Sequence, residues 1–545
     1  APRNETELRL ANIWQDILDK EMIGIHDNFF ALGGHSLKAV RLASHIYKAF
    51  EKKIPIGALF IANKLEDQAA LIDKSAKSAF SSIVHAPLQA DYPLSSAQRR
   101  LWIASQLRES NIAYNMPAAY TLEGELDIPA LSFAFRSMIE RHESLRTVFR
   151  QNDQGEPRQI ILPASDNQLY FEDLRREADQ QMRLQLLVEE DMQRSFDLST
   201  GPLLYMALYQ LQDNCWTLTF VMHHICGDGW SMDIFTRELF QLYNAQACQL
   251  QTPLQPIDIQ YKDYTYWQQQ QLNDELLLTQ QNYWLKQLKG PLPVLELPLD
   301  RNRPPVRTYI GNRIYRHISP DLSESFKTYC SAQHSTLFMG LLAAVITLLQ
   351  RYSGQNDIII GTLIAGRQHA DLENQIGCYL NTLALRIKPD PELSFPELLQ
   401  QTREITLSAY EHQFYPFDQL VDELQLQHDI NRNPVFDVSV VLQNTDVSYN
   451  QQLQQLDKLN IYPYTEQQHT VSKFDLSFEF AETTAGIEAI FIYNTDIFNA
   501  LTIARMADHL QRLMEVLIAQ PLTPLKHLNY LSEEEQHQLL VTFNQ

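Results

Sequence analysis

The stretch MHHICGDGWS, residues 222–231, joins a run of β-prone apolar residues to the start of an amphipathic helix. His223 and His224 are adjacent, so on an extended backbone their rings point to opposite sides and only one of them faces a given cleft. The glycines on either side of Asp228 favour a tight turn in a special backbone conformation, with the acid turned inward. We therefore expect one histidine at a cleft and a structural aspartate beside it.

Two alternatives to a reactive histidine are open for this stretch. A metal site is disfavoured, because the spacing HHxxxD lacks the i, i+4 pairing of metal-binding helices and no third group of ligands follows nearby. The other alternative is a pair of buried histidines that are satisfied by hydrogen bonds.

The segments around this stretch predict alternating strands and helices. Leu203–Gln210 and Cys215–Met222 are β-prone runs separated by a short polar turn, which indicates a hairpin. Further elements are expected as a helix over 232–243, a helix over 337–352, strands over 357–365 and 490–493, and a helix over 501–519. We therefore expect two α/β lobes, residues 91–267 and 268–545.

A second informative stretch, DNFFALGGHSL at residues 27–37, places Ser36 after two glycines and at the start of an amphipathic helix. The positive end of a helix favours a phosphate ester on such an exposed hydroxyl, although a serine there can also merely cap the helix. Helical spacing of apolar residues on both sides predicts an all-helical unit over residues 1–77. Residues 78–90 are rich in Ser and Ala and show no regular spacing of apolar residues, so they are expected to form a flexible linker.

Both stretches resemble motifs of nonribosomal peptide synthetases. DNFFALGGHSL resembles the attachment site of a peptidyl carrier protein, and HHICGDG resembles the HHxxxDG signature of condensation domains, which belong to the chloramphenicol-acetyltransferase-like superfamily. Six more strings that resemble the condensation family follow in order: SSAQRRLW (95–102), RHESLRTVF (141–149), YKDY (261–264), IGCYLNT (376–382), HQFYPFD (412–418) and NRNP (431–434). The sequence thus resembles an excised peptidyl carrier–condensation didomain fragment.

This resemblance implies a fold and a function. The fold is a small four-helix carrier bundle joined to an α/β condensation domain of two lobes in a V shape. The carrier is implied to hold a donor aminoacyl or peptidyl thioester on 4′-phosphopantetheine attached to Ser36. The condensation domain is then expected to form an amide with the amine of a downstream acceptor aminoacyl thioester.

The same resemblance implies two catalytic groups. His224 is expected to hydrogen-bond to the acceptor amine or to deprotonate it, and the N–H of Gly229 is expected to stabilise the oxyanion. Epimerisation, another acyl transfer on the same fold, and a non-catalytic recruitment domain are the alternatives. A degenerate recruitment domain would have lost His224 or Gly229, and both are present.

Five further residues are expected to have structural roles around the site. His223 is expected to pack on the far side of its strand, and Asp228 to hold the turn through an ion pair with Arg146 or, as a second choice, Arg141. Asn381 is expected to support the site from the second lobe, with a loop cap as its alternative.

Composition and charge narrow the partners of this chain. A formal net charge of −22 disfavours nucleic acid, and no stretch approaches the roughly 20 apolar residues of a membrane span. Five scattered cysteines favour the reducing cytosol over a disulfide framework. The resemblance adds a phosphopantetheinyl transferase and neighbouring synthetase domains, among them an adenylation domain and an acceptor carrier.

Overall fold

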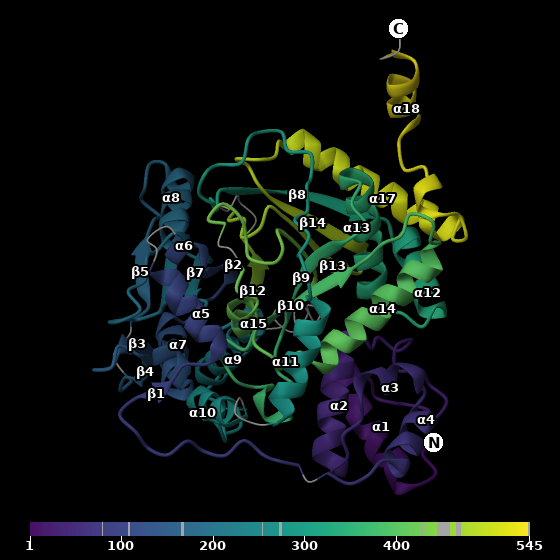
Figure 1. Ribbon diagram of the computed structural model, residues 1–545. Helices are drawn as coiled ribbons and strands as arrows, with labels where there is room; N and C mark the ends of the chain where they lie inside the picture. The colour runs from purple at the N-terminus through teal and green to yellow at the C-terminus, as the bar shows by residue number, and fades with distance from the viewer. Residues whose placement is uncertain are drawn as a thin grey trace.

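The computed structural model describes residues 1–78, 80–106, 110–164, 168–252, 254–271, 275–426, 429–443, 458–464 and 470–542. In Figure 1 a small helical unit, coloured purple, lies against the lower end of the second of two α/β lobes. Each lobe has its own open sheet with helices packed on it. The predicted architecture, a small helical bundle followed by two α/β lobes, is therefore confirmed.

The N-terminal unit is built around a buried aromatic pair. The rings of Trp14 and Phe29 meet edge to face at 5.0 Å, and both side chains are fully buried. The indole N–H of Trp14 donates to the side-chain oxygen of Gln68 at 3.0 Å, so the polar atom of the ring is satisfied inside the core. The helices of the bundle are α1 (Glu5–Leu18), α2 (Ser36–Phe50), α3 (Ile56–Ile61) and α4 (Leu65–Lys74).

The first lobe is organised around strand β7 (Cys215–His223), which is buried along almost its whole length. β7 pairs antiparallel with β6 on one side and β2 on the other, as expected of a central strand rich in aromatic and β-branched residues, and β6–β7 is the predicted hairpin. Its sheet has the order β12-β2-β7-β6-β5, beside a small sheet β1-β4-β3. The other elements are β1 (Tyr92–Pro93), α5 (Ser96–Ser105), α6 (Ser110–Ala113), β2 (Asn115–Gly124), α7 (Ile128–Arg141), β3 (Thr147–Gln151), β4 (Pro157–Ile161), β5 (Tyr170–Asp173), α8 (Gln180–Met192), β6 (Leu204–Gln212), α9 (Gly229–Ala247) and α10 (Tyr261–Gln271).

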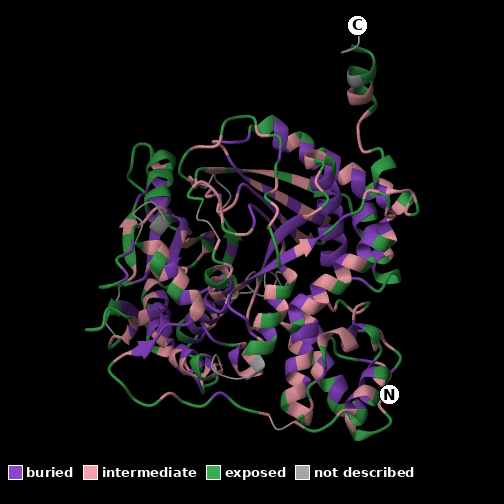
Figure 2. Ribbon diagram, in the orientation of Figure 1, coloured by how far each residue is buried: buried purple, intermediate pink, exposed green. Residues whose placement is uncertain are grey.

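The second lobe is organised around helix α13 (Leu337–Ser353), which is apolar on all sides and buried from Leu337 to Gln350. A helix of this composition belongs inside a core, and Figure 2 shows the buried residues of this lobe between its helices and its sheet. The six-stranded sheet has the order β10-β9-β11-β13-β14-β8. The remaining elements are α11 (Glu275–Gln287), β8 (Gly311–Ile318), α12 (Pro320–Ala332), β9 (Ile358–Ile364), β10 (Asn381–Ile387), α14 (Phe395–Glu411), α15 (Phe417–Glu423), β11 (Val438–Gln443), β13 (Leu476–Thr483), β14 (Gly486–Asn494), α17 (Ala500–Ala519) and α18 (Glu533–Leu540).

Two segments of the second lobe reach across to the first. Strand β12 (Leu459–Pro463) pairs antiparallel with β2 and completes the sheet of the first lobe, an exchange that no sequence pattern indicated. The loop between β9 and β10, residues 365–380, is called the bridging loop here. In this loop the carbonyl of Glu373 accepts a hydrogen bond from the indole N–H of Trp230 at 2.9 Å. The carbonyl of Gly377 accepts one from the hydroxyl of Ser231, also at 2.9 Å.

The segment between the helical unit and the lobes departs from expectation. Residues 80–90 contain no helix or strand, but they are not a free coil. Ile83 is only 4% exposed and belongs to an apolar cluster with Tyr261, and the N–H of Ala86 donates to Asp263 at 2.7 Å. The expectation of a flexible linker is therefore wrong here, because the Ile83 side chain and the Ala86 N–H both contact the surface of the α/β lobes.

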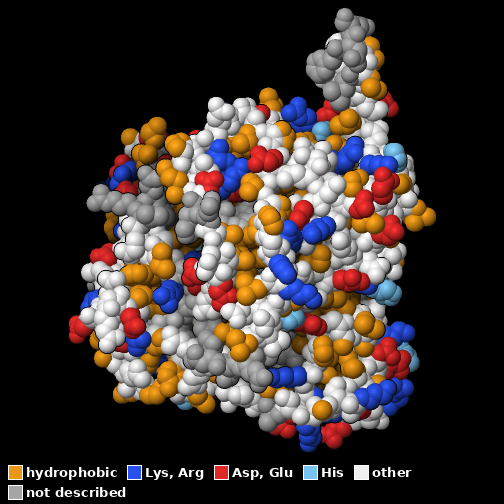
Figure 3. Space-filling model, viewed as in Figure 1, with side chains coloured by type: hydrophobic (Ala, Val, Ile, Leu, Met, Phe, Trp, Pro, Cys, Tyr) orange, Lys and Arg blue, Asp and Glu red, His pale blue; other side chains and the backbone are white. Residues whose placement is uncertain are grey.

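Two surface properties bear on the expected partners. Among the described residues no single helix is long and apolar enough to span a membrane. Helices α12 and α13 reach that length and apolar content only when taken together, and the chain bends by 102° between them. On the face shown in Figure 3, acidic and basic side chains are interspersed.

We predict that Ile83→Ala releases the connecting segment. Removing a buried isoleucine side chain costs about 2–5 kcal/mol where the cavity does not collapse, so the segment should detach more often. Limited proteolysis should then cut within residues 78–90 several-fold faster than in the unmodified protein. Val84→Ala is the matched control, because the Val84 side chain is 55% exposed. Equal cleavage rates in both variants would contradict the docked segment.

Candidate functional site

A single cavity of about 470 Å³ is bordered by the helical unit and by both lobes. Ser36 and Arg41 border it from the helical unit, and His224 and Gly229 border it from the first lobe. The second lobe contributes Thr336 at the start of α13, residues 362–367 at the end of β9 and just after it, and Lys473. The two motifs that stood out in the sequence therefore meet at one cavity.

His224 follows the end of β7 and is partly exposed to this cavity. Its backbone N–H donates to the carbonyl of Tyr114 at 2.9 Å, and its Nδ1 lies 3.9 Å from the sulfur of Cys378. Burial, with the nearby charge of Lys473, lowers the pKa of His224 to about 3. The imidazole is therefore neutral near pH 7.

His223 lies on the other side of the strand and has no exposed surface. Its Nδ1 accepts the backbone N–H of Ile225 at 3.2 Å, and its ring packs against Phe196. Burial lowers the pKa of His223 to about 4. This arrangement agrees with the alternation expected for adjacent residues on an extended backbone.

Asp228 caps the N-terminus of α9 and is completely buried. Its Oδ1 accepts hydrogen bonds from the backbone N–H and the hydroxyl of Ser231 at 2.8 and 2.7 Å, and its Oδ2 accepts the N–H of Tyr379 at 3.1 Å. Its counter-charge is Arg367 in the bridging loop, whose Nη2 lies 3.0 Å from Oδ1. The carboxylate thus fastens the start of α9 to the second lobe.

The expected ion pair of Asp228 with Arg146 or Arg141 is wrong. Arg146 donates to the carbonyl of Leu162 at 2.5 Å, and Arg141 pairs with Glu238 at 3.0 Å. The capping geometry turns Asp228 towards the bridging loop, whereas both arginines are engaged elsewhere in the first lobe.

The glycines around Asp228 also differ from expectation. Neither Gly227 nor Gly229 has a positive φ. Gly227 is required by close packing, because a Cβ there would lie 2.6 Å from the sulfur of Met222. A Cβ at Gly229 would meet no atom within 4 Å, so this residue keeps the cavity open in front of the helix N-terminus.

Ser36 is the first residue of α2 and is 7% exposed. Its hydroxyl lies 3.2 Å from that of Thr336, the residue that caps α13. The preceding glycines shape this turn: Gly33 has a φ of +103°, and a Cβ at Gly34 would lie 2.3 Å from the ring of Phe29. The turn therefore presents Ser36 to the second lobe.

Cations on α2 meet acids on the bridging loop. Arg41 donates to both carboxylate oxygens of Glu373 at 3.1 Å, and His45 approaches the same carboxylate at 3.0 Å. Lys48 donates to Asp371 at 2.7 Å. Burial opposes ionisation of Glu373, but the hydrogen bonds from His45 and Arg41 lower its pKa to about 2. The helical unit is thus held at the cavity by charge complementarity.

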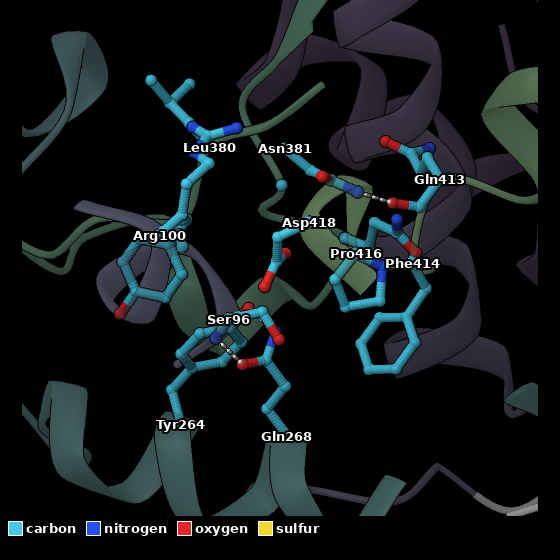
Figure 4. Close-up of a pocket in the computed structure, with 14 residues that line it drawn as sticks. Ser96, Arg100, Tyr264, Gln268, Leu380, Asn381, Gln413, Phe414, Pro416 and Asp418 are labelled. Atoms are coloured by element: carbon cyan, nitrogen blue, oxygen red, sulfur yellow. Dashed lines mark hydrogen bonds between the residues drawn. The ribbon is translucent and has the colours of Figure 1, made fainter. Parts of the chain in front are cut away.

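A smaller cavity of about 30 Å³ adjoins the large one through Gly366, Leu380 and Gln413 (Figure 4). Asp418 points into it from α15, with Arg100 of α5 on one side. Burial raises the pKa of Asp418 to about 6, against the effect of Arg100.

Asn381 borders this smaller cavity, but its side chain is engaged with the chain around it. The amide donates to the carbonyls of Gln413 and Tyr415 at 2.9 and 2.7 Å, and its oxygen accepts the N–H groups of Thr382 and Phe417. These are the contacts of a loop cap, the alternative that the sequence left open.

Four residues of the site were not predicted from the sequence: Arg367, Glu373, Thr336 and Lys473. Arg367 stands in a loop that directly follows a buried strand, a common place for functional residues, but nothing local indicates its partner. Among the described residues no group of three or more His, Cys, Asp or Glu side chains could hold a metal ion.

Comparisons with protein families and curated proteins agree over nearly the whole chain. The family described as a phosphopantetheine attachment site matches residues 9–72, and the condensation-domain family matches residues 88–540. A plipastatin synthase from Bacillus subtilis (strain 168) is 41% identical over 544 residues, covering 100% of this chain and 15% of that protein. Bacitracin synthase 3 of Bacillus licheniformis is 39% identical, covering 99% of this chain and 8% of that protein. The chain therefore spans only a small part of these relatives.

Solved structures share the two-lobed fold. The X-domain from teicoplanin biosynthesis superposes with a TM-score of 0.75 at 25% identity, covering 83% of this chain and 100% of that chain. A four-domain nonribosomal peptide synthetase bound to AMP and glycine superposes with a TM-score of 0.74 at 23% identity, covering 83% of this chain and 35% of that one. The expected cofactor, 4′-phosphopantetheine, agrees with the matched attachment site.

We predict that Arg367→Met destabilises the condensation domain far more than Arg146→Met. Removing one partner of a buried ion pair costs about 3–5 kcal/mol, because the other charge stays buried without compensation. Asp228→Asn should cost a similar amount. The free energy of unfolding, measured by urea denaturation, checks the order of these effects. A larger loss in Arg146→Met than in Arg367→Met would contradict the pairing described above.

Proposed function

Because the chain belongs to the condensation-domain family and carries a phosphopantetheine attachment site ahead of that domain, we propose that it forms amide bonds in nonribosomal peptide synthesis. The donor is an aminoacyl or peptidyl thioester held by the chain's own carrier, and the acceptor is the amine of a second aminoacyl thioester. The observation that carries this proposal is that Ser36 and His224 border one cavity.

The surroundings of Ser36 fit a long, slender arm. Ser36 borders the cavity that His224 also borders, and much of the wall is apolar, with Val40, Phe338 and Ile364 among the residues that line it. When bound to Ser36, 4′-phosphopantetheine supplies the thiol that carries the donor acyl group as a thioester.

In the proposed reaction a C–N bond forms between the acceptor amine and the acyl carbon, and the C–S bond of the thioester breaks. The proton that the amine loses ends on the released thiol, so no protein nucleophile or co-reactant is needed. His224 acts through Nε2, since its Nδ1 faces the sulfur of Cys378. The neutral ring accepts a hydrogen bond from the amine and orients it for attack.

Gly229 is proposed to stabilise the negative charge that develops on the carbonyl oxygen. It is the first residue of α9, where backbone N–H groups have no partner within the helix and the helix dipole is positive. Because Gly229 borders the cavity and has no side chain, we propose that an oxyanion approaches its N–H from the cavity. Asp228 and Arg367 serve by holding this helix end in place, and His223 by packing beneath the strand.

Two other functions are alternatives to amide formation. A recruitment domain needs no reactive histidine at a cavity, whereas His224 and the open space at Gly229 are both retained. Epimerisation or a different acyl transfer on the same fold would need the same docked carrier, so the formation of an amide with an added acceptor thioester is what distinguishes them.

The chain's own carrier, docked at the cavity, is proposed to hold the donor thioester. The acceptor carrier is proposed to come from another part of the synthetase. A phosphopantetheinyl transferase is the proposed source of the arm, and an adenylation domain the source of the aminoacyl group. The proposed compartment is the cytosol, where thiols such as the five free cysteines stay reduced.

We predict that His224→Ala lowers the rate of amide formation at least about 100-fold, because the amine loses its hydrogen-bond acceptor. Its melting temperature should stay close to that of the unmodified protein, since His224 borders a cavity. Intact mass spectrometry of the product, after loading Ser36 and adding an acceptor thioester, gives the rate. Ser36→Ala is the control and should accept no arm. Full turnover by His224→Ala would refute the assigned role.

We predict that Glu373→Arg weakens transfer from the chain's own carrier about tenfold, the effect of losing ~1.4 kcal/mol of docking energy. Adding Arg41→Glu should restore part of the rate, because the exchanged charges attract again. Single-turnover transfer from a loaded Ser36 arm measures the rates of the single and the double variant. Glu515→Arg, an exposed site on α17, is the control and should transfer normally. Unchanged transfer by Glu373→Arg would contradict donor docking at this surface.

A further inference from the structure

Ser36 lies against the second lobe, although it is the residue that receives the arm. It is 7% exposed, and its hydroxyl lies 3.2 Å from that of Thr336. The space beside it is the cavity of about 470 Å³, which is bordered by the carrier and by both lobes. A cavity of this volume admits a small molecule but no protein domain.

The carrier surface around Ser36 is covered as well. The turn before it, residues 33–35, borders a cavity of about 60 Å³ together with Ser331 near the end of α12. On α3, a Cβ at Gly57 would lie 3.5 Å from the carboxylate of Glu411 at the end of α14. The turn and α3 therefore both lie against the second lobe.

The third covered side is α2, which is held to the bridging loop by charge. Arg41 donates to Glu373 at 3.1 Å, and Lys48 donates to Asp371 at 2.7 Å. Both acids belong to the condensation domain and both cations to the carrier. The strength of docking can therefore be changed without altering the carrier.

Attachment of the arm, called priming here, needs Ser36 to be open. The Ser36 oxygen attacks the phosphorus of coenzyme A that bears the pantetheine, so one P–O bond forms, the P–O bond to adenosine 3′,5′-bisphosphate breaks, and the hydroxyl proton passes to solvent. A transferase that brings coenzyme A to the serine also needs a surface of about 800 Å², the typical share of one partner in a specific interface. The docked carrier offers no such surface around Ser36.

We propose that docking of the unmodified carrier on the condensation domain is autoinhibitory, so that Ser36 is primed only while the carrier is undocked. The partner that this contact excludes is a phosphopantetheinyl transferase, and the inference rests on the proposed function for that partner alone. The ion pairs of α2 with the bridging loop hold the closed state. The same contact that presents the arm to the cavity after priming thus delays priming itself.

The test measures priming of the full apo chain. A purified phosphopantetheinyl transferase and coenzyme A are added at fixed concentrations, and intact mass spectrometry follows the rate of arm attachment. We compare the unmodified protein with Glu373→Arg and Asp371→Lys, which change only the condensation domain. Glu515→Arg, at an exposed position of α17, is the matched control for added positive charge, and Ser36→Ala should accept no arm.

Glu373→Arg should be primed about tenfold faster than the unmodified protein, because the accessible fraction of a mostly docked carrier rises by the factor by which docking weakens. Asp371→Lys should be primed faster by a smaller factor, since its partner Lys48 is half exposed. Glu515→Arg should be primed at the unmodified rate. Added salt should speed priming of the unmodified protein relative to Glu373→Arg, because it screens the ion pairs.

Equal priming rates in Glu373→Arg and the unmodified protein overturn the proposal. So does an equal acceleration in Glu515→Arg, which would indicate that added charge merely attracts the transferase. If Glu373→Arg fails to fold, Asp371→Lys and its salt dependence decide the matter. No thioester enters the assay, so if the chain forms no amide while Glu373→Arg is still primed faster, the proposed amide formation fails and the autoinhibition stands.

Discussion

The buried pair of Asp228 and Arg367 is the constraint on which the site depends. Asp228 begins α9, and Arg367 belongs to the bridging loop of the opposite lobe, so one ion pair fixes the helix end to the second lobe. Because both side chains are almost fully buried, the pair is stable only while its hydrogen bonds are complete. The position of the N–H groups at the start of α9 therefore depends on contact between the lobes.

The same loop connects this contact to carrier docking. Glu373 offers its carbonyl to Trp230, two residues after Asp228, and its carboxylate to Arg41 and His45 of the carrier. A change in the spacing of the lobes would thus move the docking surface and the N-terminus of α9 together. This coupling gives a physical reason for the carrier to meet the cavity at a fixed place.

Electrostatics within the cavity differ from those of a hydrolytic triad. The aspartate closest in sequence to His224 is paired with Arg367, and burial is the main cause that lowers the pKa of the imidazole, with the cation of Lys473 acting in the same direction. A thioester is already an activated acyl donor and an amine is already a nucleophile, so the reaction benefits more from orientation than from a strong base. A neutral histidine in a shaped, largely apolar space suits that requirement.

The sequence alone determined the local elements and the two motif positions. Alternation of an extended backbone separated His223 from His224, helical spacing defined the carrier bundle, and the glycines before Ser36 indicated the turn that presents it, although the hydroxyl expected to be exposed is buried against the second lobe. These features depend on residues only a few positions apart, which is why local patterns reveal them. The tertiary structure alone decided the partner of Asp228, the exchange of β12, the burial of Ile83 and the meeting of Ser36 and His224 at one cavity. Each of these joins segments far apart in the chain, and their pairing is set by how the lobes pack, which no local pattern encodes.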